Sequence, residues 1–179
     1  MSNSVSLLFV SIFAIIVMFF VPSYQMAQKQ DDLAQQLVYT ETVKFVDAVR
    51  TKGYVTAEML EEYQSKIEVG SYVYRVEMVH EKKMYTPIYT NPQDPASFTG
   101  EYEVQYDEFH TKQINDYLYN NASGGSRYKM SAGDFFNVEV KNLNKTQANI
   151  LLDFFQGVTG GDSPTIVVPY GGLVLNENY

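Results

Sequence analysis

The chain of 179 residues contains no cysteine, no tryptophan and only two histidines. Without cysteine it forms no disulfide, no thiolate metal site and no cysteine nucleophile. A zinc site needs three or four well-spaced ligands, and His80 and His110 lie in different predicted elements. We therefore expect both histidines at the surface or at the edge of an element, and we expect no metal site.

Basic residues are scarce, with 13 lysines and arginines against 21 aspartates and glutamates, and the net charge is −8 at pH 7. Nucleic-acid binding needs a basic face that neutralises phosphates, so we expect no nucleic-acid partner. The same charge disfavours docking on anionic lipid. Tyrosine is abundant, with 15 residues. This residue is common at protein–protein interfaces and also suits half-buried strands, and the composition leaves both readings open.

Motifs that mark catalysis or cofactor binding are missing as well. The chain has no EF-hand loop, no phosphate-binding loop, no dinucleotide fingerprint and no Gly-x-Ser-x-Gly elbow. The adjacent carboxylates Glu61 and Glu62 would point to different faces of a helix, which disfavours a proton-sharing pair. We expect a protein that is not an enzyme, binds no cofactor and takes no small-molecule substrate.

What the chain does have is one long apolar run near its amino end. Val5–Met26 contains no charged side chain, and the first charged residue is Lys29. As a helix this run would be roughly 33 Å long, enough to cross a hydrocarbon layer of about 30 Å. Pro22 lies near its outer end, where a kink costs least. We assign the membrane anchor to Leu7, Leu8, Phe9, Val10, Ile12, Phe13, Ile15, Ile16, Val17, Met18, Phe19, Phe20 and Val21.

Two other readings of the apolar run fit less well. A cleaved signal peptide has a basic start, a shorter apolar core and a small-residue cleavage site, but residues 1–4 carry no Lys or Arg and no good Ala-x-Ala follows the run. A buried core helix is disfavoured because both faces of the run are apolar. An uncharged amino end and a large acidic remainder favour a single-pass protein with a cytoplasmic amino terminus and an extracytoplasmic head at the cell surface. An exported head without disulfides suits a Gram-positive envelope at least as well as a periplasm.

Residues 27–50 contain no Gly or Pro, and their apolar residues recur at helical spacing. Acidic residues come early and basic residues late, which suits the dipole of a helix that starts afresh after a kink at Pro22. We expect a stalk whose apolar stripe packs on the protein's own sheet, with packing on a partner as the alternative. The chain then divides into an anchor at 1–27, a stalk at 28–50 and a head domain at 51–179.

Four residues are candidates for contact with another helix or subunit. Close approach of a second helix in a membrane needs small side chains, and the span offers Ser6 and Ser11, with Ala14 nearby. Glu41 falls within the stalk's apolar stripe. It marks either the edge of that stripe or a contact with another subunit.

The head begins with a short helix and a hairpin. Thr56 has the character of an N-cap for an amphipathic helix over 57–67. Residues 72–80 alternate between apolar and mixed positions and predict a strand. The polar residues 81–83 predict a turn, and 84–90 predict the return strand, in which Pro87 requires an edge position or a bulge.

The rest of the head alternates between helix and strand patterns. In chain order we first expect a loop over 91–100, a helix within 101–120 and a loop over 121–127. A strand over 134–143 follows, and then a helix that is capped by Asn144 or Thr146 and ends at Phe155. A Gly-rich turn over 157–164 leads to a strand over 165–170, which Gly171 and Gly172 end. The hairpin implies an antiparallel pairing. The predicted fold class is therefore α+β, with a mainly antiparallel sheet of about four strands and helices on one face.

Several segments together resemble a known class of membrane-anchored protein. They are Val21–Asp31, Glu41–Arg50, Met59–Tyr63, Thr86–Tyr89, Gly133–Asn142 and Val168–Gly172. With the leading anchor, they resemble the minor-pilin-like proteins that accompany tight-adherence (Tad/Flp) pilus machinery in Gram-positive bacteria. The resemblance runs over most of the chain. It implies a minor pilin or pilus-assembly component whose partners are membrane lipid and other pilin or assembly-apparatus subunits.

One feature departs from type IV prepilins, which are usually cut after Gly or Ala just before the apolar helix and carry Glu at the fifth mature position. Residues 1–6 contain no Gly, Ala or acidic residue. The chain is then either not processed in this way, or a partner of the fibre rather than a subunit of its shaft. Two alternatives therefore stay open: a bitopic scaffold subunit of a secretion or conjugation apparatus, and a tethered ligand-binding or hydrolytic domain.

Overall fold

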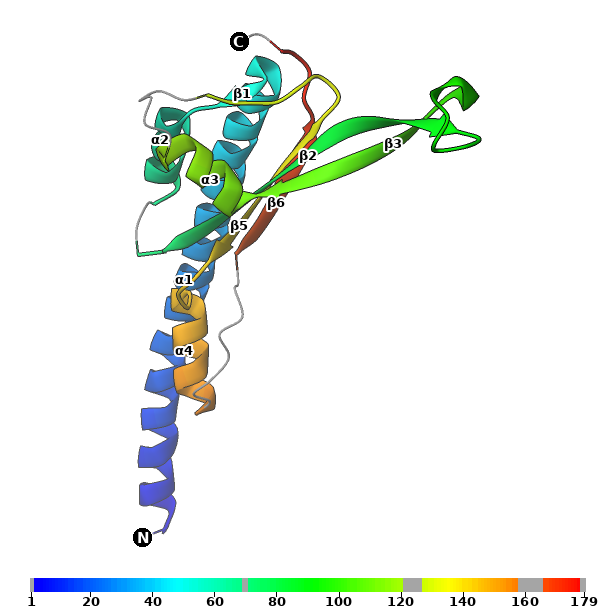
Figure 1. Ribbon diagram of the computed structural model, residues 1–179. Coiled ribbons are helices and arrows are strands. Elements are labelled where there is room, and N and C mark those ends of the chain that lie inside the picture. The colour runs from blue at the N-terminus through cyan, green and yellow to red at the C-terminus, as the bar shows by residue number, and fades with distance from the viewer. Residues whose placement is uncertain (1, 69–70, 121–126, 158–165, 178–179) are drawn as a thin grey trace.

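The computed structural model describes residues 2–68, 71–120, 127–157 and 166–177, and Figure 1 shows a long amino-terminal helix with an α+β head at its carboxyl-terminal half. The helices are α1 (Ser2–Lys52), α2 (Ala57–Ile67), α3 (Thr111–Asn120) and α4 (Gln147–Gln156), with a 3-10 turn at Pro95–Ser97. The strands are β1 (Tyr54–Val55), β2 (Tyr74–Tyr89), β3 (Phe98–His110), β4 (Tyr128–Lys129), β5 (Phe135–Asn142) and β6 (Val167–Leu173). The predicted loop at 121–127 and turn at 157–164 lie almost wholly outside the described residues.

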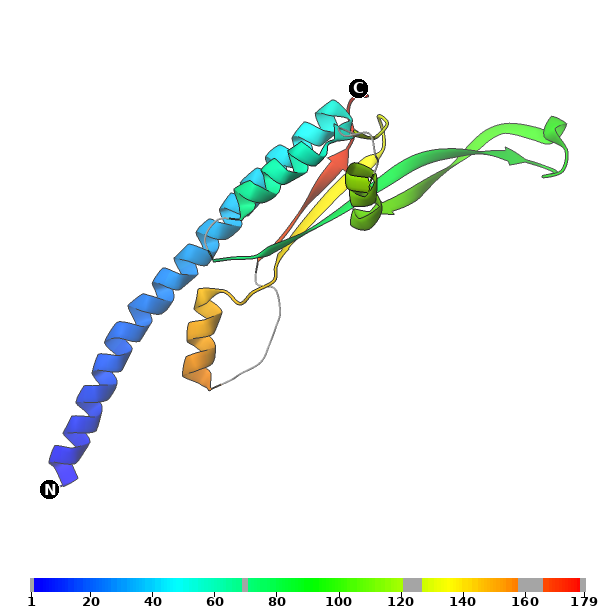
Figure 2. The same cartoon turned by 60° about the vertical axis from the view of Figure 1, so that its left-hand side comes forward.

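Helix α1 is a single uninterrupted helix that contains the predicted anchor and the predicted stalk (Figure 2). The expectation that a new helix starts after Pro22 was wrong, because the backbone remains helical on both sides of this residue. A proline ring crowds the preceding turn. In that turn the Ser23 hydroxyl donates a hydrogen bond of 2.8 Å to the Phe19 carbonyl oxygen. Such local bonds help a helix continue through proline in an apolar environment.

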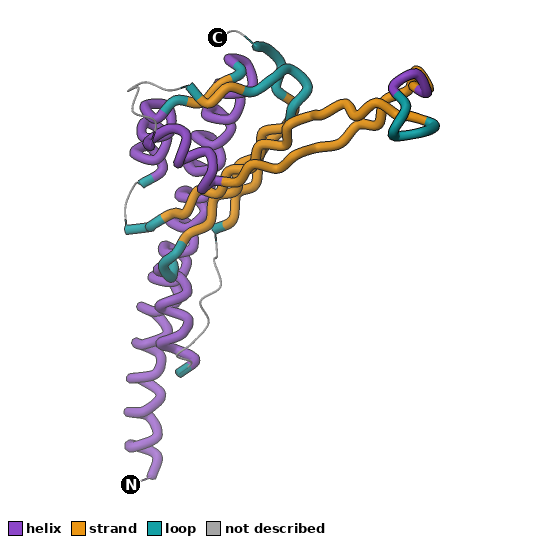
Figure 3. The backbone as a smooth tube through the Cα atoms, in the orientation of Figure 1, coloured by secondary structure: helices purple, strands orange, loops and turns teal. Residues whose placement is uncertain are grey.

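The four-stranded sheet is antiparallel throughout, with the strand order β3-β2-β5-β6, and β1 pairs with β4 in a separate two-stranded sheet. Figure 3 shows β2 and β3 running together well beyond the other two strands. The α+β class and the antiparallel sheet of four strands are thereby confirmed, with the small second sheet as an addition.

The predicted turn at 81–83 was wrong, because β2 passes straight through these residues. Lys82 lies opposite Asp107 and Lys83 lies opposite Tyr106 on β3, so cross-strand partners hold the chain extended. The segment also contains none of the glycine, asparagine or proline residues that tight turns require. The hairpin therefore forms between β2 and β3, and the register irregularity predicted at Pro87 is present between Pro87 and Tyr89.

The predicted helix within 101–120 was correct only in its second half. Residues 111–120 form α3, whereas 98–110 form β3. Residues 101–107 read Glu-Tyr-Glu-Val-Gln-Tyr-Asp, which alternates polar and apolar positions with the period of a strand. This period of two favours a strand over a helix.

Gly171 and Gly172 do not end the last strand, because β6 continues through both to Leu173. They serve close packing instead. A Cβ atom on Gly171 would lie 2.0 Å from Asn137 Oδ1, and one on Gly172 would lie 2.9 Å from the Arg50 guanidinium carbon. Glycine here lets β6 approach both β5 and α1.

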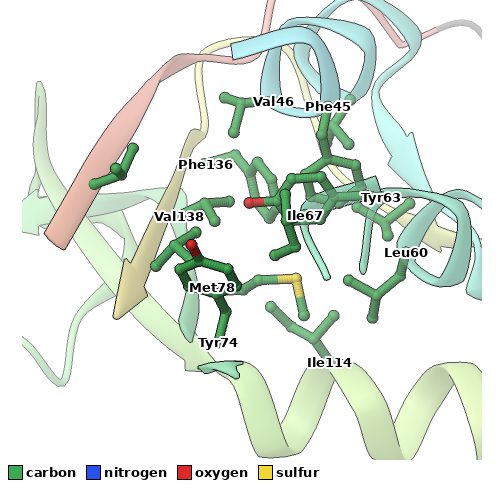
Figure 4. Close-up of a cluster of buried hydrophobic side chains, with 14 of the residues drawn as sticks. Phe45, Val46, Leu60, Tyr63, Ile67, Tyr74, Met78, Ile114, Phe136 and Val138 are labelled. Carbon is green, nitrogen blue, oxygen red and sulfur yellow. The ribbon is translucent and has the colours of Figure 1, made fainter. Parts of the chain in front are cut away.

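Helices α1, α2 and α3 cover one face of the sheet, as expected, and the core lies between them (Figure 4). On β5 the side chains alternate, so that Phe136, Val138 and Val140 are buried and their neighbours are not. The stripe on α1 faces this core. Phe45, for example, stacks on Tyr63 of α2 with ring centroids 4.5 Å apart. The carboxyl-terminal half of α1 is thus part of the head and not a separate stalk.

Polar contacts also fix α1 to the head. Thr42 Oγ1 and the Tyr63 hydroxyl are 2.7 Å apart, and Arg50 Nε donates to the Leu173 carbonyl oxygen at 2.8 Å. Nearer the anchor, the Tyr72 hydroxyl donates to the buried carboxylate of Asp31. Burial raises the pKa of Tyr63 to about 12, which keeps its hydroxyl protonated at neutral pH.

Gly53 ends α1 as predicted, with φ +73° and its N–H bonded to the Val49 carbonyl oxygen at 2.8 Å. A Cβ atom here would lie 2.2 Å from the Asn176 carbonyl oxygen. Gly133 has a similar φ of +93°, but the nearest atom to its Cβ position is Lys83 Cδ at 3.9 Å. Gly53 and Gly133 therefore share a positive φ but differ in how closely other atoms pack around the Cβ position.

We expect Gly53→Ala to lower the free energy of unfolding by about 3 kcal/mol, since backbone strain and a backbone clash add together. Gly133→Ala should cost only about 1 kcal/mol, for the strained φ alone. Chemical denaturation of the detergent-solubilised chain measures both. Equal losses in the two variants would contradict the close packing of residues 176–177 on Gly53.

Candidate functional site

The first candidate functional surface is the amino-terminal half of α1. Its most apolar stretch is long enough to cross a membrane, and none of that stretch is buried against the described head. The anchor residues assigned above lie on all sides of the helix, and nearly all of them are exposed. A helix that is apolar all round and largely exposed is suited to lipid or to other apolar helices and not to water.

Among the described hydrogen bonds, none joins the small residues of this span to another element of the chain. The Ser11 hydroxyl donates to the Leu7 carbonyl oxygen of its own helix at 2.8 Å. Ser6 and Ala14 are exposed. Glu41 lies at the margin of the packed stripe, where its carboxylate pairs with Lys44 Nζ at 2.6 Å. Glu41 thus has an ion partner within its own helix, and its role toward another subunit stays a prediction.

The second functional surface is an arm, which we define as residues 82–107 of β2, β3 and the connection between them. β5 pairs with β2 only from Tyr74 to Glu81. Beyond that point β2 and β3 pair with each other alone, and Figures 1 and 2 both show them projecting away from the head. A two-stranded ribbon is marginally stable in water by itself. The register predicts which residues share each of its faces.

The two faces of the arm differ in chemistry. The pairs Lys82–Asp107, Met84–Gln105 and Thr86–Glu103 make one face mostly polar. The pairs Lys83–Tyr106, Tyr85–Val104 and Pro87–Tyr102 make the other face mainly aromatic and aliphatic. On this second face Tyr85 is 60% exposed and Tyr102 is 57% exposed. Exposed aromatic side chains in one row are typical of a protein interaction site.

A third feature is a buried polar network at the base of the arm. His80 was expected at the surface or at the edge of an element. This was wrong, because His80 lies within β2 and its ring is buried under Phe109 and Tyr128. His80 Nε2 lies 2.9 Å from Asp134 Oδ2, and Nδ1 lies 2.8 Å from the Tyr128 hydroxyl. A pocket of about 250 Å³ adjoins these side chains. His110 is exposed, as expected, and lies 3.6 Å from Glu108.

The network is internally satisfied. Asp134 accepts hydrogen bonds from the backbone N–H groups of Lys83 and Ser131 in addition to its contact with His80. A neutral His80 that donates from Nε2 and accepts the Tyr128 proton at Nδ1 fits every contact. Burial raises the pKa of Tyr128 to about 12, so its phenol stays protonated. Both ring nitrogens of His80 are used within the protein, and this arrangement suits a structural joint between β2, β4 and β5 better than acid–base catalysis.

No metal site emerges among the described residues, where no three His, Asp or Glu side chains are grouped for an ion. The sequence did not predict that the residues of the His80 network lie together, because they come from three separate segments. The alternation in β3 was the one signal that could have revealed the arm. Comparison of the chain with protein-family models, with curated proteins and with solved structures found no match.

We expect the protein to lose stability as the pH falls below about 6.5, the ordinary pKa of histidine. Burial lowers the pKa of His80, an effect that its hydrogen bond to Asp134 only partly offsets, with nearby Lys82 lowering it and Glu81 raising it slightly. The unfolded chain therefore takes up a proton at a pH where the folded chain does not. The free energy of unfolding should be constant above this window and fall within it, by at most about 1.4 kcal/mol per pH unit.

Denaturant titrations between about pH 5 and about pH 8 measure this dependence. His80→Gln should be less stable and should lack the fall below about pH 6.5. His110→Gln is the matched control, because its side chain is exposed. It should keep the wild-type profile. A His80→Gln profile parallel to wild type would show that another group titrates.

Proposed function

We propose that the protein is a non-enzymatic minor-pilin-like or pilus-assembly component, anchored in the membrane by the first half of α1 with its head outside. The observation that carries this proposal is the division of α1 into two halves. One half is apolar on every side and is not buried in the head, and the other half is built into the head's core. Such an apolar helix can span a bilayer or pack beside similar helices in a fibre. Because α1 is continuous, the head would keep the same position relative to this helix in both settings.

The arm supports an assembly role. It adds little to the core, since its residues are mostly exposed and the buried cluster contains none of them. A long, aromatic, two-stranded projection is a costly feature unless another protein covers it. In this proposal the aromatic face of the arm binds a neighbouring pilin or apparatus subunit.

The arm also favours a second candidate function, a bitopic scaffold subunit of a secretion or conjugation apparatus. In that case α1 only tethers the protein, and the arm reaches across to a partner. The lack of Gly, Ala or acid in residues 1–6 fits this alternative better than it fits a processed shaft subunit.

Fractionation of native cells separates the two candidates. Recovery of the protein with sheared fibres is the result expected of a pilin, whereas strict retention in the membrane would favour the scaffold. Mass spectrometry of the amino terminus then tests processing: a chain trimmed just before the apolar run supports incorporation into a fibre. A soluble monomer lacking residues 1–26 would contradict both.

The arm is tested by Tyr85→Ser combined with Tyr102→Ser. Two exposed aromatic contacts at the centre of an interface are worth enough that recovery in the fibre or membrane complex should fall about tenfold or more. The melting temperature of the head should not change, because neither ring belongs to the core. Tyr119→Ser on α3 is the control, since this tyrosine is similarly exposed but lies off the arm. Normal assembly of the double variant would exclude the aromatic face as the binding surface.

A further inference from the structure

Helix α4 contributes no residue to the hydrophobic core of the described chain. It follows β5 and runs beside α1 toward the anchor, as Figures 1 and 2 both show. The ring of Phe155, near its carboxyl end, stacks on Phe20 of the anchor with centroids 4.4 Å apart. Phe20 also stacks on Tyr24, one turn further along α1. The three stacked rings thus connect α4 to the anchor.

Three large apolar side chains of α4 are largely exposed, even though one of them, Phe155, contacts α1 on one side. Phe154 is 84% exposed, Ile150 is 54% exposed and Phe155 is 52% exposed. Ile150 and Phe154 are four residues apart and therefore lie on the same face. Leaving three such side chains in water is unfavourable, and no described residue covers them.

The charged residue of α4 and polar groups at its two ends have partners within the chain. Its only charged residue, Asp153, pairs with Lys145 at 2.7 Å. The Thr146 hydroxyl accepts from the Asn149 N–H at the amino end. Gly157, in the left-handed conformation, bonds to the Asp153 carbonyl oxygen at the other end. One hydrogen bond within the chain thus caps each end of the helix.

The position of Phe20 along α1 gives the depth of α4. Phe20 lies 15 residues after Val5, or roughly 22 Å along the helix axis. If the apolar run begins at the inner edge of a hydrocarbon layer of about 30 Å, Phe20 lies within its outer leaflet. Phe155 stacks on it and must lie at the same depth.

We propose that α4 is a second membrane contact: its carboxyl-terminal half enters the outer leaflet beside the anchor, and Ile150, Phe154 and Phe155 face lipid. The occupant is lipid because the exposed surface of α4 continues the apolar surface of the anchor at the same depth. This inference rests on the anchoring part of the proposed function. Its consequence is that the head is held at a fixed height and tilt above the membrane, with two points of attachment instead of one.

Single-cysteine labelling of the full-length chain in phosphatidylcholine vesicles tests the proposal. The natural sequence has no cysteine, so one environment-sensitive fluorophore can be placed at Phe154→Cys, at Phe13→Cys in the anchor, or at Tyr85→Cys in the arm. The label at position 154 should have blue-shifted emission and be quenched by lipids brominated near the headgroup more than by lipids brominated near the chain ends. The label at position 13 should be quenched most by the deep bromines, and the label at position 85 by neither.

Each other outcome overturns a defined part of the argument. A label at 154 that reports water, with the label at 13 in lipid, would refute the role of α4 and leave the anchor intact. If neither label is quenched by lipid, the anchoring itself fails. If the label at 154 is shielded from water and from lipid, but transfers energy to a label at position 13 of a second copy, then a neighbouring anchor covers α4 and the lipid assignment is wrong.

Discussion

The structure depends on one helix that must satisfy two environments along a single axis. The first half of α1 is apolar on all sides, and the second half presents one apolar stripe to the sheet and a polar surface elsewhere. Burying a large apolar side chain is worth roughly 1.5–3 kcal/mol. The fully buried valines of α1 therefore tie the helix firmly to the head. Any force or displacement applied to the anchor is transmitted to the sheet through this packing.

The sheet likewise has two parts with different surroundings. Where β5 and β6 are present, one face is covered by helices and supplies the core. Where β2 and β3 run on alone, no described helix covers them, and the exposed aromatic row continues the face of the sheet opposite the core. The buried network of His80, Asp134 and Tyr128 lies where the ribbon leaves the sheet. Its hydrogen bonds hold the base of the arm, so that the direction of the arm is set by the head.

These features together describe a protein with three outward surfaces and a small core. The anchor and α4 form one apolar side, the arm forms a separate aromatic one, and the sheet face that no helix covers carries a groove of about 560 Å³ lined by Glu77, Glu81, Glu108 and Glu139. Four carboxylates on this face contribute to the acidic character of the chain. The described exterior is thus acidic apart from two exposed apolar surfaces.

The sequence by itself determined the apolar run, the end of α1 at Gly53, the cap at Thr56 and the extent of α2, β5 and α4. All of these follow from local rules: hydrophobic periodicity, side-chain capping and the left-handed preference of glycine. Tertiary structure alone decided that β2 continues through Lys82, that β6 continues through Gly171, and that His80 is buried. In each case the deciding partner comes from a distant segment: Asp107 opposite Lys82, Asn137 beside Gly171, and Asp134 bonded to His80. Long-range pairing overrides local preference at these positions because the free energy comes from the partner, which no local pattern contains.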